Sequence, residues 1–107
     1  MRSRPTILFH SPDARPVPAV LRRWAEVRGF PVLEFRRGAE LESIVLRGAS
    51  CLIFLDGDET GADGLAMVRR LKADAFTAIV PAVVLSGTHA PERVGEWFAA
   101  GADEVIT

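Results

Sequence analysis

An apolar run that ends in an acid is the most informative feature of this chain of 107 residues. Five apolar residues, 51–55, are followed at once by Asp56, and an acidic, glycine-rich stretch covers residues 57–64. In open α/β sheets, ligands bind in the crevice outside the carboxyl ends of the strands. A carboxylate placed there can hold a metal ion or act as a nucleophile towards phosphorus. Asp56 is therefore the first candidate for a functional residue.

The composition of the chain limits the classes of protein that it can belong to. The formal net charge is −1 and the pI is about 6.1, so the sequence lacks the basic character of nucleic-acid-binding domains. No apolar stretch approaches the roughly 20 residues that a membrane span needs. The single cysteine, Cys51, excludes an internal disulfide and is expected to be buried. We predict a cytoplasmic protein with neither a nucleic-acid nor a membrane partner through this domain.

Strand-like and helix-like segments alternate along the chain. Mainly apolar runs at residues 6–10, 31–35, 50–55 and 82–85 are expected to be strands, and so is the last segment, 103–107. Helical spacing follows Pro16 and Pro18 and recurs over 38–46, over 63–74 and from Pro91 to Gly101. The resulting β-α-β-α-β-α-β-α-β order predicts an α/β fold, with a parallel sheet and helices on both of its faces.

Local patterns predict how some side chains are placed. Val20, Trp24 and Val27 recur at helical spacing, which indicates an amphipathic first helix with Trp24 in the core. Asp63, just before an apolar helical period, is expected to be a helix N-cap. Lys72 falls on the polar face of that same helix.

Several motifs, in matching order and spacing, resemble those of one known family. Residues 55–64 resemble the L-D-x-x-M-P-G-M-D-G turn of that family, with Thr60 in place of the proline. Residues 83–87 resemble its fourth strand, and residues 99–103 resemble the segment before its fifth strand. The chain is thus similar, over nearly its whole length, to the CheY-like receiver domain of response regulators. The resemblance implies a three-layer, flavodoxin-like fold with strand order 2-1-3-4-5, as a single domain over residues 1–107 that stops before the family's fifth helix.

The same resemblance implies a role in two-component signal transduction rather than an enzymatic one. It makes Asp56 the phospho-acceptor of a phosphorelay and Ser86 the hydroxyl that contacts the phosphoryl group. It implies a histidine kinase or phosphotransfer protein as the donor. The output would come from a further domain or from a protein partner.

The chain departs from the family at the residues that bind magnesium. The family ends its first strand with acidic residues, where this chain has Ser11 and Pro12, and Asp13 remains at the outer position. Because Mg²⁺ prefers hard oxygen ligands, Asp56, Asp58 and Asp13 are the candidate ligands, and we expect magnesium binding to be weak or absent. Metal ions assist phosphoryl transfer. Two alternatives therefore stay open: weak phosphorylation of Asp56, or a phosphorylation-independent pseudo-receiver that acts through protein contact.

The end of the chain departs from the family too. Val105 stands where the family has an aromatic residue, and the family's lysine would follow Thr107. Without the fifth helix, one side of the sheet near the last strand lacks its cover. An uncovered apolar face or sheet edge favours self-association, so we predict a homodimer.

A second motif keeps an enzyme as the alternative. Asp56, Asp58 and Thr60 also fit D-x-D-x-T, which resembles the nucleophile motif of haloacid-dehalogenase-like phosphatases. In that motif the first aspartate attacks phosphorus and the second is the general acid and base. Ser86 resembles the second motif of those enzymes, whereas their later lysine and acidic pair have no clear counterpart here.

Overall fold

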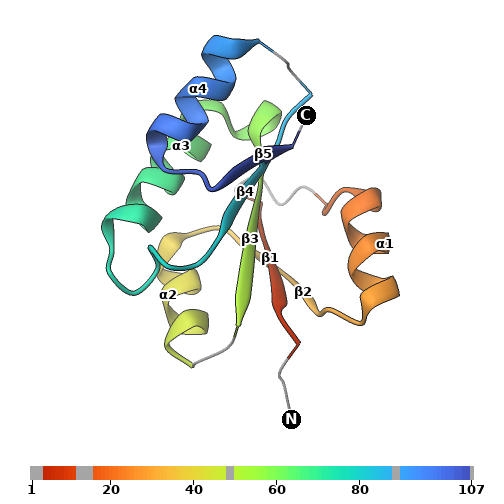
Figure 1. Cartoon of the computed structure of the whole chain (residues 1–107). Coiled ribbons are helices and arrows are strands. Elements are labelled where there is room, and N and C mark those ends of the chain that lie inside the picture. The colour runs from red at the N-terminus through yellow and green to blue at the C-terminus, as the bar shows by residue number, and fades with distance from the viewer. Residues whose placement is uncertain (1–3, 12–15, 48–49, 88–89, 107) are drawn as a thin grey trace.

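Five parallel strands form one sheet in the order β2-β1-β3-β4-β5 in the computed structural model, which describes residues 4–11, 16–47, 50–87 and 90–106 (Figure 1). This order confirms the flavodoxin-like prediction. The strands are β1 (Thr6–His10), β2 (Val32–Phe35), β3 (Cys51–Asp56), β4 (Ala82–Leu85) and β5 (Glu104–Ile106).

The helices in the described part of the chain lie in two layers, one on each face of the sheet. Figure 1 shows α1 alone on one face and α2, α3 and α4 together on the other. None of these helices has both the length and the apolar character that crossing a membrane requires. Their bounds are α1 (Ala19–Arg28), α2 (Gly38–Leu46), α3 (Gly57–Ala73) and α4 (Pro91–Ala100).

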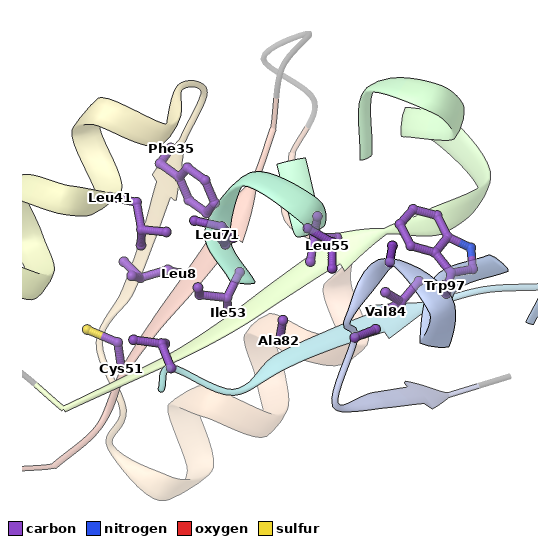
Figure 2. Packing of buried hydrophobic residues seen from close by; sticks show 14 residues of the cluster. Leu8, Phe35, Leu41, Cys51, Ile53, Leu55, Leu71, Ala82, Val84 and Trp97 are labelled. Atoms are coloured by element: carbon purple, nitrogen blue, oxygen red, sulfur yellow. The ribbon is translucent and has the colours of Figure 1, made fainter. Parts of the chain in front are cut away.

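Each face of the sheet carries its own apolar cluster. The larger cluster lies beneath α2, α3 and α4, and Figure 2 shows Ile53, Leu55 and Trp97 within it. The smaller cluster joins Phe54 and its neighbours in β1 to the inner side of α1. Because successive side chains of a strand point to opposite faces, β3 supplies both clusters. β3 is therefore buried on both sides, as its continuous run of apolar residues indicates, and Cys51 is buried as expected.

The C-terminal ends of α1 and α4 and the start of α4 lie at the glycines and the proline that mark them in the sequence. Gly29 follows α1 with φ of 71° and Gly101 follows α4 with φ of 112°, both in the left-handed region that residues with a Cβ rarely adopt. Pro91 opens α4, where the first helical amide has no intrahelical acceptor in any case.

The start of α3 differs from the sequence-based prediction. The helix begins at Gly57, directly after β3, so Asp63 lies inside the helix rather than at its N-cap. No proline occurs between residues 57 and 73, so no residue of the segment lacks an amide hydrogen or clashes with the preceding turn. The helix therefore continues back to the strand despite its glycines.

The outer side of α1 differs from expectation as well. Leu21 and Ala25 form the buried side of the helix, whereas Val20 and Val27 are 84% and 76% exposed. Trp24 is half-buried, with its ring edge-on to Phe30 and its centroid 5.5 Å away. The apolar stripe of α1 is therefore wider than the surface that the sheet covers.

Candidate functional site

Three polar side chains gather at the carboxyl edge of the sheet, where the sequence predicted a site. Asp56 ends β3 and is in register with Leu85, so Ser86 follows on the adjacent strand. His10 is in register with Leu55, so Ser11 comes next to Asp56 on the other side. The structure thus brings the two predicted residues Asp56 and Ser86 to one edge and adds Ser11 to them.

Backbone hydrogen bonds fix both sides of this edge. The amide of Ser11 donates to the carbonyl of Phe35 at 2.8 Å, and that of Ser86 donates to the carbonyl of Ile106 at 2.9 Å. Ser11 and Ser86 are only 2% and 8% exposed, whereas Asp56 is half-buried. Asp56 is therefore more accessible than Ser11 and Ser86, which flank it as buried residues.

His10 lies next to this edge without joining it as a ligand set. Its side chain is 2% exposed, and its ring centroid is 5.2 Å from that of Phe35. This burial against an aromatic ring fits the structural role that a lone histidine at a strand end usually has.

Trp97 packs beneath the end of β3 that carries Asp56. A Cβ added at Gly57 would stand 2.7 Å from Val84 Cγ1 and 3.2 Å from Trp97 Cζ2, so the indole packs against the backbone directly after Asp56. Trp97 is fully buried, and its Nε1 has no hydrogen-bond partner among the described residues. Sequence reasoning missed this contact; the glycine immediately after the acid was the available signal.

The described residues do not make a magnesium site by themselves. Within them, no group of three or more histidine, cysteine, aspartate or glutamate side chains could hold a metal ion. Asp56 is the one carboxylate that the described side chains bring to this edge, because Ser11 occupies the adjacent strand end. Asp13 and the side chain of Asp58, the other predicted ligands, lie outside the described part of the chain.

Lys72 lies at the opposite, amino edge of the sheet. Its ammonium group contacts Asp103, which precedes β5, so it is far from the strand ends that carry Asp56. The side chain is 16% exposed, which corrects its placement on a solvated polar face. At this distance Lys72 supplies no charge to the strand ends that carry Asp56.

Two regulatory proteins are similar to this chain over most of its length. No family model matches it. It is 26% identical over 95 residues to the phosphate regulon transcriptional regulatory protein PhoB of Pseudomonas aeruginosa, covering 89% of this chain and 42% of that protein. It is 31% identical over 105 residues to the gliding motility regulatory protein of Myxococcus xanthus, covering 98% of this chain and 13% of that protein. The chain therefore spans less than half the length of these relatives.

Solved structures of response regulators share the fold. The chain superposes on a response regulator from Thermotoga maritima with a TM-score of 0.73 at 23% identity, covering 96% of this chain and 83% of the other. The phosphorylated cyanobacterial phytochrome response regulator RcpA gives 0.67 at 22% identity, covering 98% and 81%. The Mn²⁺-bound form of response regulator Rcp1 gives 0.64 at 19% identity, covering 96% and 80%. Fold and sequence similarity together identify this chain as a CheY-like receiver domain of the response-regulator type.

Proposed function

We propose that this domain serves two-component signal transduction as a divergent receiver in which phosphorylation of Asp56 is weak or lost. One observation carries the proposal: the strand end beside Asp56 holds the buried Ser11 in place of a carboxylate. A single described carboxylate gives little charge with which to hold a divalent cation. Without that cation, charge that develops on a transferring phosphoryl group is poorly stabilised.

The signal then depends mainly on protein contact. The partners are a histidine kinase or phosphotransfer protein on the input side, and an output domain or separate protein on the other. The similarity to PhoB and to the gliding motility regulator supports such partners, since both are named as regulatory proteins. We place the domain in the cytoplasm and assign it no enzymatic activity of its own.

The placement of Asp56 and Ser86 at one edge supports the phosphoryl-transfer roles that the family resemblance implies. If phosphate is accepted, a carboxylate oxygen of Asp56 forms a bond to phosphorus while the bond from phosphorus to the donor's leaving group breaks. That leaving group is the imidazole nitrogen of a phosphohistidine donor, or the acetate oxygen when acetyl phosphate is the donor. Ser86, on the neighbouring strand end, would then donate its hydroxyl to a phosphoryl oxygen. Solved structures of similar fold include one described as phosphorylated and one described as Mn²⁺-bound, which supports testing both events here.

The test is the intact mass of the chain after incubation with Mg²⁺ and acetyl phosphate. We expect little phosphate-sized gain in the natural sequence. A Ser11→Asp, Pro12→Asp variant, which restores the acidic pair, should gain phosphate, and Asp56→Ala in that background should abolish the gain. Full phosphorylation of the natural sequence would overturn the proposal. No gain in the restored variant, with its fold verified by circular dichroism, would show that the missing acids are not the cause.

The relatives and structures described above are all regulators, so they give no support to the phosphatase alternative. That alternative predicts turnover of a small phosphate ester that Asp58→Ala abolishes. The receiver proposal predicts no turnover in either protein.

A further inference from the structure

Residues 74–81 connect α3 to β4 at the amino edge of the sheet (Figure 1). Phe76 and Ile79 are 66% and 83% exposed there, whereas Thr77, between them, is only 1% exposed. This is the reverse of the usual distribution, in which threonine faces water and large apolar side chains are buried. Every exposed residue from 73 to 81 is apolar, and together they form what we call the α3–β4 patch: Ala73, Ala75, Phe76, Ile79 and Pro81.

Hydrogen bonds hold the loop in this inverted arrangement. The hydroxyl of Thr77 donates to the carbonyl of Leu71 at 2.6 Å. The amides of Phe76 and Ala78 donate to the side chain and the carbonyl of Asp74, each at 2.8 Å. Turning Thr77 outward and the apolar side chains inward would break these bonds, so the patch is a fixed feature of the fold. A partner that binds a surface already in place loses less conformational entropy on binding.

The charge left available beside the patch is positive. The side chain of Asp74 already accepts a backbone amide, and Asp103 already contacts Lys72 at 2.6 Å. Arg69 is exposed four residues before Ala73, so it lies on the same side of α3. Within the described part of the chain Arg69 makes no ion pair. A ligand of this surface therefore meets an uncompensated cation next to exposed apolar side chains.

We propose that the α3–β4 patch docks an amphipathic, acidic helix of a partner protein. Phe76 and Ile79 pack against the apolar stripe of that helix, and Arg69 pairs with a carboxylate beside the stripe. Ala66 and Ala73 flank Arg69 along the exposed side of α3, and their small side chains let a second helix approach α3 closely. An apolar partner without acids would leave the charge of Arg69 unpaired at the interface.

A second copy of this chain fits the patch less well. A two-fold pairing of the patch with itself places the same residues opposite one another, so the two Arg69 side chains would approach. Like charges brought together at an interface oppose association. The patch also lies at the amino edge of the sheet, opposite the edge that carries Asp56. The proposal therefore goes beyond phosphoryl transfer, and its test needs neither Mg²⁺ nor a phosphodonor.

Titration of the isotope-labelled chain with a synthetic peptide, followed by NMR, tests the proposal. The peptide has about 18 residues, so that a helix can form, with leucines on one face and glutamates on the other. We expect saturable chemical-shift changes centred on residues 66–81. A Phe76→Ser, Ile79→Ser variant should bind at least about tenfold more weakly, because both apolar anchors are lost. No saturable binding, or shifts centred on another surface, would overturn the proposal.

Charge variants test the role of Arg69. Arg69→Glu should weaken binding about tenfold by placing like charges together. Arg36→Glu is the matched control and should leave binding unchanged, because Arg36 is exposed directly after β2, at the carboxyl edge of the sheet. A peptide with lysines in place of the glutamates should bind the natural chain more weakly, and equal binding of the two peptides would contradict the acidic partner. Concentration-dependent shifts of residues 66–81 without peptide, absent from the serine variant, would assign the patch to a second copy instead.

Discussion

Lys72 Nζ lies 2.6 Å from Asp103 Oδ2 and thereby joins the end of α3 to the turn that precedes β5. The same ammonium donates to the carbonyls of Ala78 at 3.0 Å and Val80 at 2.8 Å, which uses all three of its donors. Asp103 Oδ2 also accepts from the amide of Ala82 at 2.8 Å. This cluster holds the amino edge of the sheet together, opposite the edge that carries Asp56.

Replacing Lys72 with methionine should therefore destabilise the fold. Methionine keeps an apolar stem but leaves two carbonyls and the Asp103 carboxylate without their shared donor. We expect the free energy of unfolding to fall by about 2 kcal/mol, measured by urea denaturation. Arg69→Met, on an exposed position of the same helix, is the control and should change stability by less than about 0.5 kcal/mol. Equal stability of the two variants would mean that the cluster contributes nothing.

The Asp103 carboxyl should make stability depend on pH in acid. Partial burial raises its pKa, but the hydrogen bond from Lys72, the amide of Ala82 and the charge of Lys72 together outweigh burial and lower the pKa below its ordinary 3.8. A carboxyl with a lowered folded-state pKa contributes stability above its unfolded pKa and loses it as pH falls through the folded value. Since half of the side chain is exposed, solvent screening keeps this contribution modest.

Asp103→Asn should accordingly be less stable than the natural sequence at neutral pH, and the difference should shrink below about pH 4. Thermal or urea unfolding of both proteins across this range gives the comparison. A difference that stays constant down to the most acidic conditions would assign the loss to shape or hydrogen bonding rather than to the charge.

Gly57 and Gly95 offer a matched pair of alanine substitutions. At Gly57 a Cβ would stand 2.7 Å from Val84 Cγ1, 3.2 Å from the Trp97 ring and 3.3 Å from the carbonyl of Leu85, so Gly57→Ala should cost about 1–3 kcal/mol. At Gly95, inside α4, nothing lies within 4 Å of the added atom, and alanine should gain up to about 1 kcal/mol through its helix propensity. Denaturant unfolding measures both, and a neutral Gly57→Ala would contradict the close packing beneath Asp56.

Much of the fold follows from local signals in the sequence. The bounds of β1, α2, β4 and α4 match the prediction, because prolines, glycines and continuous apolar runs mark them. The strand order and the position of Asp56 follow from the alternation of elements and from the resemblance. The start of α3 could not be predicted from local signals, because the glycines of residues 57–64 suggest a turn. The absence of proline from that stretch was the signal that a helix could form there.

What the sequence could not supply depends on contacts between distant elements. Lys72 has the periodicity of a surface residue, and only the approach of residue 103 encloses its side chain. Val20 has the spacing of a core residue, and its exposure depends on how far α1 reaches across the sheet. The roles of Asp56, Ser86, Asp58 and Asp13 stay predictions, and of these the structure places Asp56 and Ser86 together at one edge.

The two tryptophans of the chain lie on opposite faces of the sheet, Trp24 in the wall of an apolar groove beside α1 and Trp97 under the strand end that carries Asp56. The molecule therefore contains two built-in fluorophores, one half-exposed on the α1 face and one buried beneath the candidate site. Replacing either indole with phenylalanine leaves a chain that reports on a single location. Events at the α1 face and events at Asp56 become separable optical signals, with no external label attached to the protein.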